Sequence, residues 1–182
     1  MDHKALELFT SEVFAGRYLN AGYDLALVTW AENMITAGFE SEHLNILVGE
    51  IAPFNQFEID QLLDRLQSDL KLPVISSNSE AITIVATAYV KRFIDGLADS
   101  ASTMFELAEL YKSEGHAESI YDFYLLHYAA VDLKIEGFQW YWPDANRKNI
   151  EKIIKARCFE WLKEHPLKRW QQYEWKRKDQ IT

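Results

Sequence analysis

Residues that could carry out catalysis or hold a metal are sparse in this sequence, and their spacing matches no common site. Glu40-Ser-Glu-His43 is the only Glu-x-x-His spacing, whereas a two-metal site in a helical bundle needs two such motifs and further carboxylates. There is no His-Glu-x-x-His motif, no Gly-x4-Gly-Lys phosphate loop, no Gly-x-Ser-x-Gly motif and no cysteine pair for zinc. We therefore expect no catalytic residue, no metal and no cofactor, and we expect that the protein is not an enzyme.

Cys158 and His127 also have catalytic potential, but both fall on apolar faces of predicted helices. This position favours an inert thiol in the core for Cys158. For His127 it predicts a hydrogen-bonded core histidine on a helix from about residue 118 to 133. Ile120, Tyr124 and Val131 lie on the same predicted buried face, and Phe123 and Tyr128 widen it.

A group of carboxylates lies in the second half of the chain, and it has two interpretations. Carboxylates on helix faces are usually solvated, although pairs of them can act as acid and base. Alternatively, they form a binding patch for a partner. The group comprises Glu106, Glu109, Glu114, Glu118, Asp122 and Asp132.

The segment that follows, Ile135 to Pro143, reads IEGFQWYWP and holds four aromatic residues within five positions. Trp and Tyr bury much area at low entropic cost, so this loop, with Trp140, Tyr141 and Trp142, could anchor a partner. It could equally seal the C-terminal helix onto the body, because Trp is usually largely buried. The two interpretations differ in the exposure of the loop.

The elements that must position these residues are helices, because apolar residues recur every three or four positions. The expected helices are 3–18, three short helices within 21–70, one after Ser76 to Ser79, one ending at Gly115, one over about 118–133, one from Asp144 and one after Pro166, where Leu167, Trp170 and Tyr173 point inward. This pattern predicts an all-α fold, a single globular domain over 1–182 with about eight or nine helices packed as antiparallel hairpins.

Individual residues mark the expected helix ends. Gly38 is a natural stop for the first helix of 21–70, Ser41 opens the second, and Asn55 with Glu58 reads as a capping pair for the third. Asp144 is the expected N-cap of the penultimate helix. Apolar residues on most sides of 82–90 predict the most buried helix; the β-branched run 82–85 also allows a strand, but no second strand-like run exists to pair with it.

The charge is unevenly distributed. The formal net charge is −9; residues 1–144 hold 8 Lys or Arg and 23 Asp or Glu (−15), and 145–182 hold 11 and 5 (+6), which sum to −9. We thus distinguish an acidic body 1–144, which includes the aromatic loop 135–143, from basic C-terminal helices 145–182 that end in Trp175-Lys-Arg-Lys178. Such acidity disfavours nucleic acid as a partner and favours a basic protein, or serves only solubility.

The single cysteine and the N-terminal sequence predict a cytoplasmic location. Cys158 has no partner for an internal disulfide, and residues 1–4 lack the basic stretch and apolar run of a secretion signal. No apolar run approaches the roughly 18 to 20 residues that cross a bilayer, so we expect no membrane association.

The sequence also resembles a known family. Trp30-Ala31, Gly38, Ser41, Leu44, Ile46-Leu47 and Gly49 resemble a pattern in small acidic helical immunity proteins of bacterial contact-dependent growth inhibition and other polymorphic toxin systems. The resemblance implies a cytoplasmic, non-catalytic protein that binds a cognate toxin domain, such as a basic RNase, over its active site. It implies a monomer in a 1:1 complex and supplies no binding residue.

Our hypothesis is that the six carboxylates and the loop residues Trp140, Tyr141 and Trp142 form the toxin-binding surface, because they are dense and adjacent in sequence. Carboxylates can occupy the phosphate groove of an RNase, and close charge pairs across such interfaces contribute several kcal/mol. Two alternatives remain open: an acidic helical scaffold or adaptor that binds a cellular partner without catalysis, and an enzyme with an unrecognised carboxylate site.

Overall fold

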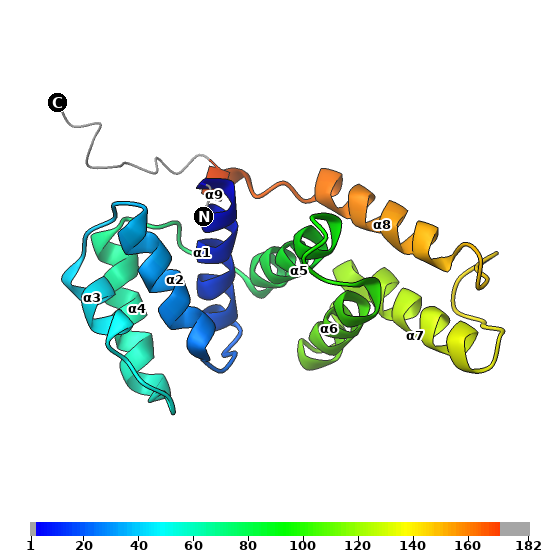
Figure 1. Ribbon diagram of the computed structural model, residues 1–182, viewed down its shortest axis with the longest axis horizontal. Helices are drawn as coiled ribbons and strands as arrows, with labels where there is room; N and C mark the ends of the chain where they lie inside the picture. Colours follow the sequence, from blue (N-terminus) through cyan, green and yellow to red (C-terminus); the bar gives the residue numbers. More distant parts are fainter. Residues whose placement is uncertain (1–2, 172–182) are drawn as a thin grey trace. The chain divides into compact units, whose positions relative to one another are not determined.

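The computed structural model describes residues 3–171. Within this range it contains nine α-helices, one short 3-10 helix and no strand, which confirms the all-α fold (Figure 1). Contacts group the described residues into two compact units, one comprising 3–81 with 167–171 and the other comprising 82–166. The expected contribution of Tyr173 and the basic stretch 175–178 lie outside the described residues.

The first unit is built around a buried tryptophan. It contains α1 (His3–Tyr18), α2 (Leu25–Thr36), α3 (Glu42–Val48), α4 (Gln56–Asp69) and α9 (Lys168–Gln171). The indole Nε1 of Trp30 in α2 donates to Thr10 Oγ1 in α1 at 2.9 Å, and the Phe14 ring meets the indole edge-on. Trp170 of α9 is also buried, as the sequence predicts.

Local signals explain where the helices of this unit begin and end. Ser41 and Asn55 are the N-caps of α3 and α4, because their side chains accept hydrogen bonds from the backbone N–H groups of His43 and Phe57. Gly38 follows α2 with φ +90°, a conformation that glycine adopts without a steric penalty. Gly38 as the helix stop and Ser41 and Asn55 as N-caps are confirmed, whereas the part of Glu58 in a capping pair stays a prediction.

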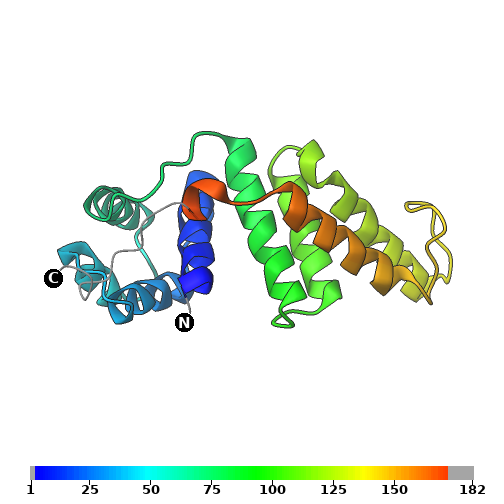
Figure 2. The same ribbon diagram turned by 90° about the horizontal axis from the view of Figure 1, so that it is seen from above.

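The second unit contains most of α5 (Asn78–Ile94), with α6 (Ser100–Ser113), the 3-10 helix η1 (Glu118–Ile120), α7 (Tyr121–Ile135) and α8 (Ile150–Glu164). Between residues 81 and 90 of α5, every residue is buried except Thr83 and Tyr89, which are half-buried. This burial confirms the prediction of a deeply buried helix at this position. The helices α6 and α7 form a hairpin, and α8 contacts α7 (Figure 2).

The core of the second unit repeats the arrangement of the first. Trp161 of α8 is fully buried, and its Nε1 donates to Thr87 Oγ1 of α5 at 3.1 Å. The Thr87 hydroxyl in turn donates to the backbone oxygen of Thr83 at 2.7 Å. A threonine hydroxyl therefore supplies the hydrogen bond that a buried indole requires in both units.

Two sequence predictions about the second unit are wrong. The helix α8 begins at Ile150, and Asp144 has φ 59° and caps no helix. Asn146 and Asn149 explain the delay, because their side-chain oxygens accept from the N–H groups of Lys148 and Asn146 and thus close a turn before the helix.

The predicted inner face of α7 is also displaced. Its buried residues are Phe123, Leu126, Ala129 and Leu133, whereas Tyr124, His127 and Val131 are half-buried. Ile120 and Phe123 are buried as predicted. Apolar and aromatic residues occur on most sides of this helix, so helical periodicity alone does not identify the face that packs.

Candidate functional site

A row of tyrosine rings covers the outer side of the α6–α7 hairpin. Tyr121, Tyr124 and Tyr128 are separated by three and four positions on α7, which places them on one helix face. Tyr111 of α6 packs beside Tyr121 and Tyr124, and Tyr141 of the loop extends the row beyond Tyr128. We call these five residues the tyrosine ladder. Ring centroids lie 4.5 Å apart for Tyr111 and Tyr124, 4.9 Å for Tyr124 and Tyr128, and 5.7 Å for Tyr128 and Tyr141.

The ladder is accessible to a partner over most of its length. Tyr121 and Tyr141 are exposed, Tyr124 and Tyr128 are half-buried, and Tyr111 is buried. Sequence reasoning placed Tyr124 in the core and therefore missed the ladder. The available signal was the spacing of the three α7 tyrosines, since a phenol both packs along its ring and keeps its hydroxyl in water.

His127 lies beside the ladder and is not a hydrogen-bonded core histidine. It is half-buried, its ring contacts those of Phe105 and Tyr128, and it makes no hydrogen bond within the described residues. Burial lowers its pKa, and Lys112 of α6 acts in the same direction, while Glu109 opposes them. The imidazole is thus favoured in its neutral form, which suits a surface built of aromatic rings.

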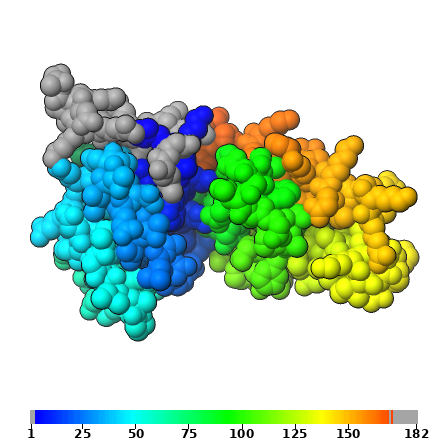
Figure 3. Space-filling model, in the orientation of Figure 1, coloured from blue at the N-terminus to red at the C-terminus, as the bar shows by residue number. Residues whose placement is uncertain are grey.

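The aromatic loop between α7 and α8 continues the ladder. Trp140 is 87% exposed, and Phe138 and Tyr141 are exposed as well, whereas Trp142 is half-buried. The segment lies at the surface in the space-filling view (Figure 3). The interpretation of the loop as a plug is therefore wrong for Trp140, and the loop is available as an anchor.

Two side chains that sequence reasoning did not single out for this role hold the loop in shape. Gln139 Oε1 accepts from the N–H groups of Tyr141 and Trp142 at 2.7 and 2.8 Å, and its Nε2 donates to the Trp142 oxygen at 2.6 Å. Arg147 Nε donates to the Leu133 oxygen at the end of α7 at 2.5 Å. These bonds fix the backbone around the exposed rings, which reduces the entropy lost on binding.

The six predicted carboxylates do not form one free patch. Glu106 and Glu118 are exposed and make no hydrogen bond or ion pair with other described residues. Glu109 is exposed but pairs with Lys112 on the same helix. Glu114 is the half-buried C-cap residue of α6, and Asp132 is half-buried near the end of α7.

Asp122, the remaining carboxylate, is committed to the fold. Arg157 of α8 donates to it at 3.0 Å and also pairs with Glu164 at 3.0 Å. The two carboxylates raise the pKa of the Arg157 guanidinium against the opposing effect of its burial. Asp122 thus joins α7 to α8.

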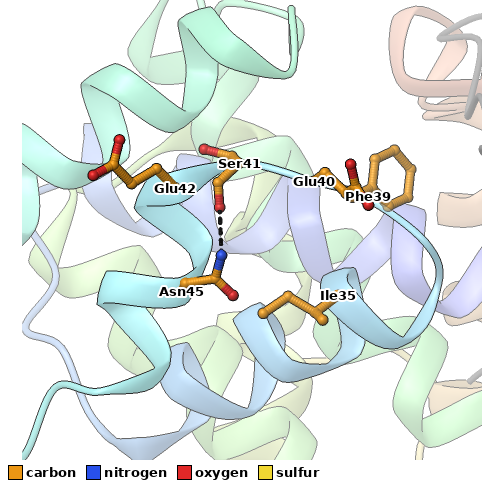
Figure 4. Close-up of a pocket in the computed structure, with 6 residues that line it drawn as sticks. All are labelled: Ile35, Phe39, Glu40, Ser41, Glu42 and Asn45. Carbon is orange, nitrogen blue, oxygen red and sulfur yellow. Dashed lines mark hydrogen bonds between the residues drawn. The ribbon is translucent and has the colours of Figure 1, made fainter.

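The first three residues of the Glu40-to-His43 segment, the one metal-like motif, line a pocket of about 410 Å³ at the start of α3 (Figure 4). Its lining includes Ile35, Phe39 and Asn45, and Asn45 Nδ2 donates to the Ser41 backbone oxygen at 3.3 Å. Ser41 and His43 both contact one oxygen of Asp69, at 2.5 and 2.8 Å.

This cluster does not form a nucleophile and base pair. The Ser41 hydroxyl donates to Asp69 rather than to the imidazole, so no base is placed to take its proton. The hydrogen bonds from Ser41 and His43 lower the pKa of Asp69, as expected for a carboxylate that accepts two donors. The arrangement ties α3 to the end of α4.

The remaining candidates also lack reactive geometry. Cys158 is buried, and burial raises the pKa of its thiol to about 12. Within residues 3–171, no group of three or more His, Cys, Asp or Glu side chains is placed to hold a metal ion, and no helix in that range is long and apolar enough to span a membrane. The best-formed candidate site is therefore the tyrosine ladder with the aromatic loop.

Comparison of the chain with models of protein families, with curated proteins and with solved structures finds no match.

Proposed function

We propose that the protein is an immunity protein that binds a basic toxin domain, such as an RNase, and blocks its active site without catalysis of its own. The single observation that carries this proposal is the exposure of Trp140, at 87%, on a loop held by Gln139 beside the tyrosine ladder. Large rigid aromatic residues that stand in solvent are typical anchors of protein–protein interfaces.

The acidic residues around this surface support a basic partner. Glu118 precedes Tyr121 by three positions, and both Glu106 and Glu118 are exposed without a partner among the described residues. Unpaired rim carboxylates attract a positively charged surface and speed association, while buried aromatic anchors slow dissociation. A toxin that binds RNA must carry positive charge where it holds phosphates.

The proposal is tested by co-expression with the C-terminal domain of a toxin encoded directly upstream. We expect cells to survive and the two chains to co-purify. Trp140→Ala should weaken the complex by about 2 kcal/mol or more, roughly thirtyfold, as for other aromatic anchors. The matched control is Phe57→Ala, because Phe57 of α4 is also an exposed aromatic, at 69%.

Charge reversal tests the two unpaired carboxylates, Glu106 and Glu118, separately from the aromatic anchor. Glu106→Lys with Glu118→Lys should slow association markedly at low salt, whereas Glu32→Lys with Glu58→Lys, two exposed carboxylates of the first unit, should have a smaller effect. If the toxin does not co-purify, the proposed function is wrong. If the toxin binds but only the control variant, Glu32→Lys with Glu58→Lys, slows its association, the proposed function stands and the toxin binds at another surface.

A further inference from the structure

A second surface of the same unit has the opposite charge. Lys152, Lys155, Phe159 and Lys163 recur at intervals of three and four residues along α8, so they form one stripe about 16 Å long. All four side chains are exposed. We call this set the α8 stripe.

The lysines of the stripe are not used by the fold. None of the three makes a hydrogen bond or ion pair with its side chain within residues 3–171, although acidic residues exceed basic ones in the whole chain by 28 to 19. Two nearby carboxylates are engaged elsewhere, because Glu151 accepts from the Ser100 hydroxyl at 2.8 Å and Glu164 pairs with Arg157. The exposed Glu160 lies about 100° around the helix from Phe159.

An apolar pocket opens beside two of these lysines. Its volume is about 570 Å³, and it lies between α5 and α8, lined by Phe93, Glu151, Lys152, Lys155, Ala156 and Phe159. Phe159 is 45% exposed. The volume falls in the range of common ligand sites, and a bulky apolar side chain placed here would remove both phenylalanine rings from water.

We propose that this pocket and the α8 stripe bind an acidic segment of a second protein, with one bulky apolar side chain in the pocket and carboxylates along the lysines. Charge complementarity assigns the sign of the partner, and a stripe longer than the pocket favours an extended segment over a small molecule. A nucleic acid fits less well, because the pocket is lined mainly by apolar surface and offers no hydrogen-bonding group to bases beyond Glu151 and the lysines. This inference is independent of the proposed toxin-binding surface, which requires a basic partner.

The test uses the whole chain and a fluorescent peptide with glutamates on both sides of a central Phe-Leu pair, followed by fluorescence anisotropy at low salt. We expect saturable binding that weakens at least tenfold when Gly-Gly replaces Phe-Leu, because the apolar anchor is lost. Absence of binding at millimolar protein would overturn the proposal. So would equal binding of the Gly-Gly peptide.

Variants locate the site. Lys152→Gln with Lys155→Gln should weaken peptide binding about fivefold, the sum of two exposed charge pairs, and Phe159→Ser should weaken it about tenfold. The matched control is Lys71→Gln with Lys134→Gln, which removes two exposed lysines elsewhere and should change affinity less than twofold. Unchanged far-UV circular dichroism checks the fold of each variant.

The last experiment replaces the peptide with a single-stranded DNA of the same net charge as the peptide. We expect it to bind at least tenfold more weakly than the peptide. If the DNA binds as tightly, or if the control pair of lysines matters as much as Lys152 and Lys155, the assignment of this surface to an acidic protein segment is refuted.

Discussion

The hydrogen bond between Trp161 and Thr87 allows a quantitative test of the second unit. Trp161 is 0% exposed, and its N–H donates to a threonine hydroxyl that is itself buried. Thr87→Val preserves the shape of the side chain but removes this acceptor, so the indole N–H is buried without a partner. An unsatisfied buried donor costs about 1–3 kcal/mol, and we therefore expect the free energy of unfolding to fall by about 2 kcal/mol.

The measurement is urea unfolding followed by far-UV circular dichroism, with thermal unfolding alongside it. A loss of about 2 kcal/mol should lower Tm by roughly 4–8 °C for a chain of this length. Thr87→Ser is the control that retains the hydroxyl, and it should lose only the contribution of one methyl group, about 1 kcal/mol.

A double-mutant cycle isolates the bond itself. In a Trp161→Phe background there is no indole N–H to satisfy, so Thr87→Val should cost little. The reasoning is refuted if Thr87→Val is as stable as the wild type, or if it costs the same in both backgrounds. Thr10→Val beside Trp30 should repeat the result in the first unit, because the same bond occurs there at 2.9 Å.

Three further predictions concern titration, reactivity and a turn. Burial and Lys112 lower the pKa of His127 from 6.5 against the effect of Glu109, so the unfolded chain takes up this proton first as pH falls. The stability that neutral His127 contributes is present above about pH 6.5 and is lost as pH falls through the lower pKa of the folded state. His127→Gln should therefore reduce the slope of the unfolding free energy against pH in that window. An unchanged slope contradicts this prediction. The Cys158 thiol, with its pKa raised to about 12, should resist iodoacetamide at mildly alkaline pH until urea unfolds the chain, and full alkylation of native protein is the contrary result. Gly38→Ala should cost about 1 kcal/mol in urea unfolding through backbone strain at φ +90°, whereas Gly22→Ala, also in open space but without a positive φ, should cost less.

The elements of the fold follow from local signals that need only a few neighbouring residues. Gly38, Ser41 and Asn55 act through their own backbone or through an N–H two residues away, so their roles are legible in sequence. The start of α8 is less legible, because the side-chain oxygens of Asn146 and Asn149 accept from the N–H groups of Lys148 and Asn146 and close a turn where the sequence predicts helix. Local competition of this kind depends on geometry that composition does not reveal.

The candidate site was less predictable than the fold. The cluster of aromatic residues in the loop is visible in the sequence, but the exposure of Trp140 is not. The hydrogen bonds from the Tyr141 and Trp142 N–H groups to Gln139 follow from the folded shape of the loop and from no sequence pattern. The carboxylate patch illustrates a second limit. Asp122 counts as one negative charge in the sequence, yet its partner Arg157 lies 35 positions away in α8, and no local pattern predicts that pairing.

The pairing of Asp122 with Arg157 changes how the proposed complex with a toxin domain should respond to salt. Since only Glu106 and Glu118 among the six carboxylates are both exposed and unpaired, electrostatics should act mainly on the rate of association, and the exposed aromatic residues should set the rate of dissociation. In surface plasmon resonance with the toxin domain, Glu118→Lys should lower the association rate at low salt, and the difference from wild type should shrink as salt rises. Trp140→Ala should instead raise the dissociation rate at every salt concentration. If Trp140→Ala altered only the association rate, the aromatic loop would not be an anchor. The affinity would then have to come from the six carboxylates, most of which are paired or half-buried in the fold.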